Sequence, residues 1–251
     1  MPVGGKRILV YAGNRTTDAA LASLFDSFPC GTAERPFVIA QLGQSLDGRI
    51  ATPTGDSKYI NRDAALDHLH AIRAHVDAVL VGIGTVLADD PLLTVRRVPG
   101  RSPARIVLDP SGRLPPQAQV LREDGAARLV VTRPGVGVPP GAEAVAIAPG
   151  ADGTIAPAAI LSALGARGFR RILVEGGART VSGFMDAGLV DRLHVLVAPL
   201  ILGSGPAGLS LRPIGPLSEA LRPATRTYLL PDGDVLFDCD LRAGPAAAAA
   251  E

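Results

Sequence analysis

The sequence has no tryptophan, only two cysteines and almost no net charge. Cys30 and Cys239 lie in no CxxC pattern and near no set of histidines, which argues against a metal site and fits a reducing cytosol. Lys and Arg total 25 against 24 Asp and Glu, so no overall field favours nucleic acid or an anionic membrane. The sequence lacks a signal-peptide pattern and any apolar run of about 18 residues. We therefore expect a soluble, cytoplasmic protein without nucleic-acid or membrane partners.

Short β-branched runs alternate with helical stretches, a pattern typical of α/β proteins. Several runs are continuously apolar, as in strands covered on both faces, which predicts a mainly parallel central sheet flanked by helices. The expected division is an N-terminal extension over 1–34, one domain over 35–242 and a disordered tail over 243–251. Strands are expected at 37–42, 78–81, 105–108, 128–132, 144–148, 171–174, 192–199 and 235–241, and helices at 61–75, 156–165 and 178–187.

The expected helix 61–75 repeats apolar residues at three-to-four spacing. Asn61 is its expected N-cap, and His68 and His75 are expected to face solvent. Neither histidine belongs to a GxSxG or HExxH motif, and GxxxxGK[ST] is absent as well, which argues against serine hydrolases, zincins and P-loop enzymes.

Two polar segments follow the first expected strand. SLDGRIA at 45–51 most simply forms an Asp-Gly turn, and the alternative is that it brings backbone groups to a ligand at the carboxyl edge of the sheet. In GDSKYIN at 55–61, Ser57 and Asn61 either cap the next helix or lie beside an anion at its N-terminus. Tyr59 either stacks on a flat ring or fills a gap.

The segment VGIGTVLADDPLLTVR at 81–96 begins where a strand ends in GxGT. Thr85 either donates to a phosphate or caps the next turn, and the third glycine of a dinucleotide fingerprint is missing. Asp89 and Asp90 are expected to point to different sides, one of them into a cleft. Arg96 and Arg97 form either a phosphate fork or a solvated basic pair.

The segment LVEGGARTV at 173–181 predicts a strand, a glycine pair and the start of a helix. The N–H groups after Gly176 and Gly177 would be free at a helix N-terminus, where they can bind a phosphate. Glu175 ends an apolar strand, so we expect it to have a polar partner.

Taken in order, SLDGRIA, GDSKYIN, DAVLVGIGTVLADDPLLTVR, RIVLD and LVEGGARTVSGFMDAGLVDRLHVLVAPLILG resemble the reductase domain of riboflavin biosynthesis, over residues 35–241. That domain is similar in fold to dihydrofolate reductase. The resemblance implies an NADPH-dependent reduction, at ribose C1′, of 5-amino-6-(5-phosphoribosylamino)uracil or its 2,5-diamino analogue to the ribitylamino form, and a homodimer. The zinc deaminase that many members carry has HxE and PCxxC signatures, which are absent, so the resemblance implies a reductase standing alone.

The resemblance also assigns site residues. It implies substrate binding by Ser57, Arg73, Leu93, Arg96 and Glu175, with Arg73 and Arg96 holding the phosphate, and cofactor binding by Gly43, Tyr59, Thr85, Asp89, Gly176, Gly177, Ala178, Arg179, Thr180 and Val181. Asp89 and Glu175 are the implied catalytic carboxylates; Asp89 either stabilises a developing cation or relays a proton, and water is an equal proton source.

Three positions depart from the family pattern, with Gln41 in place of Lys, Gly43 in place of Ala and Tyr59 in place of Trp. Gln41 favours one alternative, a reductase of a pterin or another small heterocycle on the same scaffold. A second alternative is a nucleotide-binding homologue without turnover, against which the presence of Asp89, Arg96 and Glu175 argues.

Overall fold

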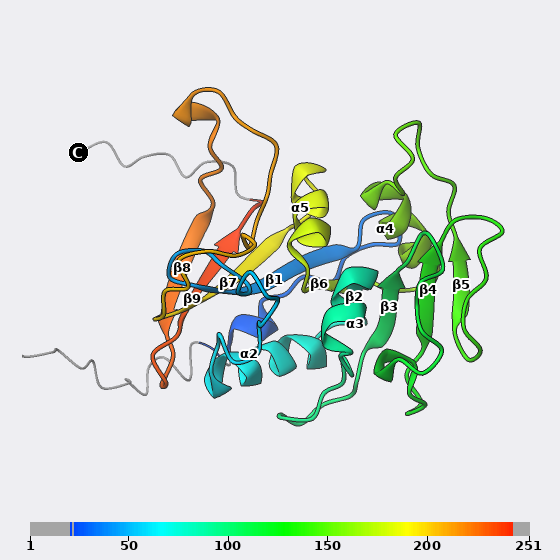
Figure 1. The fold of residues 1–251 in the computed structure, drawn as a ribbon, viewed down its shortest axis with the longest axis horizontal. Coiled ribbons are helices and arrows are strands. Elements are labelled where there is room, and N and C mark those ends of the chain that lie inside the picture. Colours follow the sequence, from blue (N-terminus) through cyan, green and yellow to red (C-terminus); the bar gives the residue numbers. More distant parts are fainter. Residues whose placement is uncertain (1–20, 22, 243–251) are drawn as a thin grey trace, which may run out of the picture.

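The computed structural model describes residue 21 and residues 23–242, and in this part of the chain nine strands form one sheet (Figure 1). The strand order is β5-β4-β3-β2-β6-β1-β7-β9-β8. Neighbours from β5 to β7 are parallel, and β9 and β8 are added antiparallel. The strands are β1 Phe37–Ser45, β2 Ala78–Gly82, β3 Ala104–Leu108, β4 Arg128–Thr132, β5 Glu143–Ala146, β6 Arg171–Glu175, β7 Arg192–Ala198, β8 Ala224–Leu229 and β9 Val235–Asp240.

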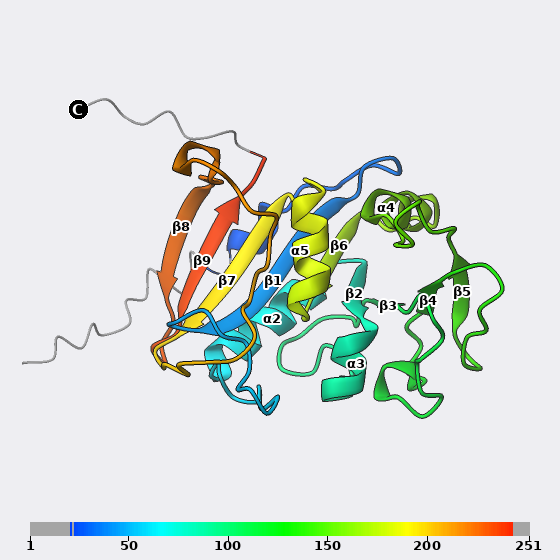
Figure 2. The same cartoon turned by 45° about the horizontal axis from the view of Figure 1, so that its top comes forward.

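Helices cover both faces of the sheet, as the two cartoon views show (Figures 1 and 2). They are α2 Asp63–Ala74, α3 Ile83–Asp89, α4 Pro157–Ala166 and α5 Ala178–Asp186, with short 3-10 turns η1 Gln119–Leu121 and η2 Leu217–Glu219. Helices α4 and α5 pack on one face and α2 and α3 on the other. No helix among the described residues is long and apolar enough to cross a membrane.

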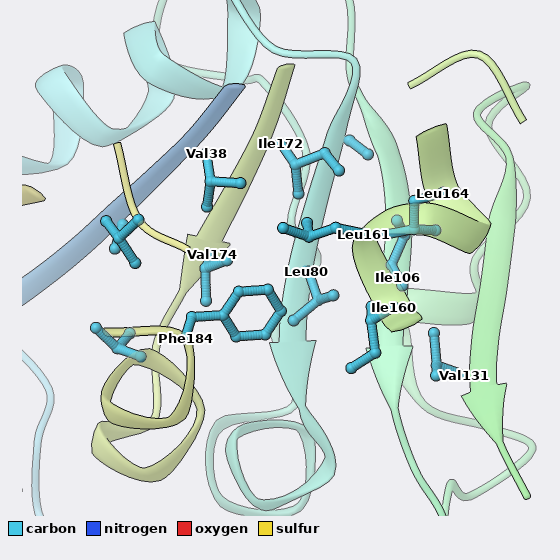
Figure 3. Close-up of a cluster of buried hydrophobic side chains, with 14 of the residues drawn as sticks. Val38, Leu80, Ile106, Val131, Ile160, Leu161, Leu164, Ile172, Val174 and Phe184 are labelled. Carbon is cyan, nitrogen blue, oxygen red and sulfur yellow. The ribbon is translucent and has the colours of Figure 1, made fainter. Parts of the chain in front are cut away.

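One core lies between the sheet and the helices α4 and α5. Leu80 and Ile106 of the central strands point toward Ile160 of α4 and Phe184 of α5 (Figure 3). All four side chains are almost fully buried. Burying each such side chain contributes about 1.5 to 3 kcal/mol to the stability of the fold. Alternate residues of the strands therefore face α4 and α5, and the residues between them face the opposite side of the sheet.

The second core lies under α2 and α3, and the chain before β1 contributes to it. Leu24, Phe25 and Phe28 are buried there together with Ile72 of α2 and Leu173 of β6. These three residues belong to the expected N-terminal extension, whose boundary at residue 34 stays a prediction. Residues 1–20, 22 and the expected tail 243–251 lie outside the described residues.

The expected fold class is confirmed, and each expected strand and helix is present with ends within three residues. Helix α3 and strand β8 were not expected. The expected Asn61 cap is wrong, because Arg62 occupies the N-cap position and the Asn61 side-chain amide instead donates to the Leu196 carbonyl and the Asp234 carboxylate. His68 does not face solvent but is buried against the sheet.

Candidate functional site

A cavity of about 480 Å³ opens near the carboxyl ends of β1 and β2, between the loop after β1, helix α2 and the segment after α3. Parallel strands all end at the same edge of a sheet, so this is where an open α/β sheet usually binds ligands. Seven of the residues expected from the sequence line it: Gly43, Ser57, Tyr59, Arg73, Asp89, Leu93 and Arg96. The structure therefore brings together residues that are far apart in the chain.

Three non-glycine residues have a positive φ in the part of the chain that the structure describes, and all three line this cavity. They are Tyr59 at 66°, Asp90 at 41° and Leu93 at 55°. L-residues seldom adopt this conformation, and it costs of order 1 kcal/mol or more unless surrounding contacts impose it. Leu93 is buried, whereas Tyr59 is 86% exposed at the cavity mouth, with its ring available for stacking.

Arg73 of α2 and Glu175 at the end of β6 form a buried ion pair beside the cavity. The Arg73 Nε donates to Glu175 Oε2 at 2.9 Å, and its Nη2 donates to Oε1. The remaining Nη1 donates to the Thr94 carbonyl at 3.1 Å. This pair is the polar partner expected for Glu175, and it also means that the Arg73 guanidinium is already engaged by a carboxylate.

Arg96 and Arg97 have different roles in the structure. Arg97 turns back to α2 and binds the carboxylates of Asp63 at 2.8 Å and Asp67 at 2.5 Å, as a solvated surface pair. Arg96 lines the cavity with its side chain largely exposed, and partial loss of solvent together with the neighbouring Arg73 lowers the pKa of its guanidinium. Among the described residues, neither Arg96 nor Lys58, which also lines the cavity, has a carboxylate partner within 4 Å. Both cations are therefore left to bind an anion here, and Arg96 is the one that the resemblance assigns to the phosphate.

Asp89 and Asp90 bind different partners, but both line the cavity, whereas the sequence predicts that one of them faces a cleft. The Ser57 hydroxyl donates to Asp89 Oδ1 at 3.3 Å across the cavity. Gln119 donates hydrogen bonds to Asp90: its backbone N–H binds the Asp90 carboxylate at 2.8 Å, and its side-chain amide binds the Asp90 backbone carbonyl at 2.9 Å. Gln119 also lines the cavity and was not expected, because nothing local in its sequence marks it as a neighbour of Asp90.

The Gly176-Gly177 turn begins α5 as expected, with Gly177 at the N-cap position. Both glycines have a positive φ, and a Cβ on Gly177 would lie 2.9 Å from Thr85 Oγ1. Thr85 lies in the first turn of α3 and packs against the Gly176-Gly177 turn. The sequence instead predicts Thr85 at the end of a strand or in the loop after it. Of the expected cofactor segment, Arg179 is exposed and Val181 is buried in the core, so only the backbone of Val181 can face a ligand.

Two of the three positions that depart from the family pattern, Gln41 and Gly43, are tightly packed, whereas Tyr59 is exposed. A Cβ on Gly43 would lie 1.9 Å from the Asn61 side-chain oxygen, so Asn61 occupies the space beside it. Gln41 is buried and lies in register between Glu175 of β6 and His194 of β7.

The SLDG segment forms the turn that was its simpler interpretation. Gly48 adopts a positive φ and donates its N–H to the Ser45 carbonyl. The Asp47 carboxylate accepts the Ser45 hydroxyl and the backbone N–H groups of Leu202 and Gly203, which lowers its pKa to about 2. Asp47 thus ties two loops together and does not line the cavity.

A buried histidine pair was missed by sequence reasoning. His68 Nε2 lies 3.0 Å from His194 Nδ1, and His194 Nε2 lies 3.2 Å from Asp238, which also pairs with Arg192. Burial and the neighbouring His194 lower the pKa of His68 to about 3. A signal existed in His194, a single histidine within an apolar strand, but its partner lies 126 positions away.

Known proteins are similar in sequence to this chain over most of its length. The family model of the RibD C-terminal domain matches residues 36–224. A Methanothermobacter thermautotrophicus protein named 2,5-diamino-6-ribosylamino-4(3H)-pyrimidinone 5′-phosphate reductase is 38% identical over 179 residues, covering 67% of this chain and 80% of that protein. The riboflavin biosynthesis protein RibD of Aquifex aeolicus is 38% identical over 185 residues, covering 72% of this chain. The chain spans only about half of that protein, 51% of its length.

A solved structure shares the fold. The crystal structure of the Thermotoga maritima diaminohydroxyphosphoribosylaminopyrimidine deaminase/5-amino-6-(5-phosphoribosylamino)uracil reductase has a TM-score of 0.68 and 31% sequence identity. The match covers 83% of this chain and 57% of that one. Fold, sequence and the family model agree, and the chain belongs to the RibD C-terminal domain family.

Proposed function

We propose that this chain is a reductase that converts a ribosylaminopyrimidine 5′-phosphate to its ribitylamino form with NADPH as the reductant. The observation that carries the proposal is the cavity in which Arg96, Asp89 and Tyr59 meet beside the Arg73–Glu175 pair. A cation for a phosphate, a carboxylate for a reacting centre and an aromatic ring for a flat base are the groups that this substrate requires. The names of the relatives support the same reaction class.

The glycine turn fits a nucleotide cofactor. The N–H groups of Ala178 and Arg179 have no acceptor within the helix, whereas that of Thr180 already donates to the Gly177 carbonyl at 3.0 Å, and the positive end of the helix dipole favours an anion. The exposed Arg179 in its first turn is the candidate partner for a 2′-phosphate. When bound, the nicotinamide supplies a hydride for reduction of the substrate.

Cofactor preference tests this assignment directly. We expect NADPH to bind more tightly than NADH in a fluorescence titration. Arg179→Ala should weaken NADPH binding by about 10-fold to 100-fold, since a charge-assisted contact contributes about 1.5 to 3 kcal/mol, and should leave NADH binding unchanged. Equal affinity for the two cofactors would remove the NADPH assignment.

The chain's own residues act by positioning and charge. Arg96 binds the phosphate, and the Arg73–Glu175 pair fixes the wall beside it. Ser57 donates to Asp89, which leaves the second carboxylate oxygen of Asp89 available to the cavity. Asp89 is our candidate for stabilising the positive charge that develops at the C1′–nitrogen bond or for relaying the proton that this nitrogen gains.

A labelled substrate experiment decides between this function and the alternative. With C4-deuterated NADPH, deuterium should appear at C1′ of the ribitylamino product, and parallel assays with the 2-oxo and the 2-amino pyrimidine identify the natural one. Oxidation of NADPH by dihydropterins, with both ribosylaminopyrimidine phosphates untouched, would favour a pterin reductase instead. Buried Gln41, in place of a cationic residue, is the feature that favours that alternative.

We also propose that two copies associate through the sheet edge at β8. Five of the six β8 residues are exposed, and the segment before it exposes Leu217 and Leu221 by 74% and 63%. Such an edge strand with neighbouring apolar side chains is typical of a protein interface. Sedimentation should give a dimer. The double variant Leu217→Asp/Leu221→Asp should be a monomer, whereas Leu87→Asp in α3 should remain a dimer.

The expected cytoplasmic location stays a prediction.

A further inference from the structure

The cavity wall between α3 and β3 is held by two side chains of α2 and by one of its own side chains, that of Ser102, rather than by secondary structure. Its Thr94 carbonyl accepts a hydrogen bond from Arg73 at 3.1 Å, and its Val95 N–H donates to the Ser102 hydroxyl at 3.1 Å. The Arg96 N–H donates to Nδ1 of His70 at 3.0 Å. Each of three successive residues is therefore fixed through a backbone atom.

His70 lies on α2, one turn before Arg73, and is only 2% exposed. Burial and the cations of Arg73, Arg96 and Arg97 lower its pKa to about 4, against which Asp67 acts weakly. The ring is thus neutral at neutral pH, with its proton on Nε2, because Nδ1 accepts the Arg96 N–H. A neutral acceptor suits this place, because a positive charge on His70 would be repelled by the three arginines.

The Arg96 side chain itself has little to hold it. It is exposed, and its one side-chain hydrogen bond to a described residue is a long one, 3.4 Å to the Thr94 hydroxyl. The direction in which the guanidinium leaves the chain therefore depends on the backbone at Arg96. That backbone is fixed on one side by His70 and on the other by Leu93, which is buried with a positive φ.

We propose that His70 is a positioning residue for the phosphate group of the substrate, acting through the Arg96 main chain. The inference rests on the proposed function, since it takes Arg96 as the phosphate-binding cation. It adds a residue of α2 to the phosphate subsite and makes α2 the common support of Arg96 and of the Arg73–Glu175 pair.

The test compares kcat/KM for the phosphorylated substrate with kcat/KM for the same molecule without its 5′-phosphate. Arg96→Ala should lower this ratio by about 10-fold to 100-fold, and His70→Ala by about 3-fold to 10-fold, since a misplaced cation loses part of a charge-assisted contact. His70→Asn should stay within about 2-fold of the wild type, because its amide oxygen can accept near the place of Nδ1. His75→Ala, at the C-cap of the same helix, where the ring nitrogen bonds to the Ala71 carbonyl, should leave the ratio unchanged.

The double variant of Arg96→Ala with His70→Ala should have the ratio of Arg96→Ala alone, since His70 acts only through Arg96. A general loss of structure would instead lower kcat/KM for both substrates and leave the ratio as it was. If Arg96→Ala lowers the ratio and His70→Ala does not, His70 has no such role and the proposed function stands. If Arg96→Ala leaves the ratio unchanged, the phosphate assignment fails and this inference fails with it.

A measurement without turnover checks the contact itself. A ¹⁵N–¹⁵N coupling across the hydrogen bond should join the Arg96 amide nitrogen to His70 Nδ1 in NMR spectra of the full chain. It should be present without any ligand and should disappear in His70→Asn. Its absence from the wild-type protein would overturn the inference.

Discussion

Arg73 and Glu175 join helix α2 to the end of strand β6 across 102 positions of sequence, through two hydrogen bonds between buried side chains. The pair forms part of the support of the cavity and fixes the third guanidinium nitrogen on the Thr94 carbonyl. Two charges out of water stabilise the fold only while each has its partner.

Removing one member of this pair should destabilise the protein strongly. Glu175→Ala leaves the Arg73 guanidinium buried without a carboxylate, and we expect the free energy of unfolding to fall by about 3 to 5 kcal/mol in urea titrations. The matched control is Glu143→Ala, which breaks the exposed Glu143–Arg167 pair and should cost at most about 1 kcal/mol. Similar losses in the two variants would show that the buried pair does not support α2.

The glycine turn should be sensitive to a single methyl group. In Gly177→Ala, the new Cβ meets Thr85 Oγ1 at 2.9 Å on a backbone with φ of 69°, so we expect a loss of about 1 to 3 kcal/mol of stability and weaker NADPH binding. Gly183→Ala, in the interior of the same helix, meets nothing within 4 Å and should be neutral or stabilising by up to about 1 kcal/mol. Thermal melting and fluorescence titration together separate the two effects, and wild-type NADPH affinity in a folded Gly177→Ala would contradict the assignment.

The sequence predicts the buried strands well because each of them is visible as an apolar run within its own segment. It does not reveal α3, because Ile83–Asp89 follows a strand directly and contains Gly84 in a segment typical of a ligand-binding turn. It does not reveal β8 either, because an exposed edge strand needs no apolar alternation.

In the candidate site, too, some features can be predicted from local sequence and others cannot. Local patterns identify the carboxylate of Glu175 as needing a partner, but they cannot say that the partner is Arg73 on a distant helix. In the same way, His68 has a solvent-facing position by helical periodicity but is buried against His194 of β7, 3.0 Å away, and the Phe25 ring. Contacts between elements far apart in sequence are set by the packing of the whole chain, which no single segment contains.

The buried histidines should make the protein less stable in mild acid. The pKa values of His68, His70 and His194 are lowered in the folded chain, to about 3 for His68 and about 4 for His70. Below the ordinary value of 6.5 the unfolded chain therefore binds more protons than the folded chain, so stability is complete above about pH 6.5 and falls as the pH decreases. Urea titrations from pH 7.5 to about 4.5 should give an uptake of up to three protons on unfolding.

His68→Gln isolates one of these protons. A glutamine amide can still donate to His194 Nδ1, so the contact is kept while the titrating ring is lost. The uptake on unfolding should fall by about one proton. An unaltered slope in His68→Gln would mean that the ring is protonated in the folded chain.

Asp89→Asn tests whether the carboxylate in the cavity takes part in the chemistry. The amide keeps the size of the side chain and can still accept from the Ser57 hydroxyl, but it carries neither the charge nor a transferable proton. If Asp89 stabilises the developing cation or relays the proton, single-turnover hydride transfer should slow by about 100-fold or more. Ser57→Ala removes only the hydrogen bond to Asp89 and should slow the same step by about 10-fold at most. A loss of only about 10-fold in Asp89→Asn would make Asp89 a positional contact and leave water as the proton source.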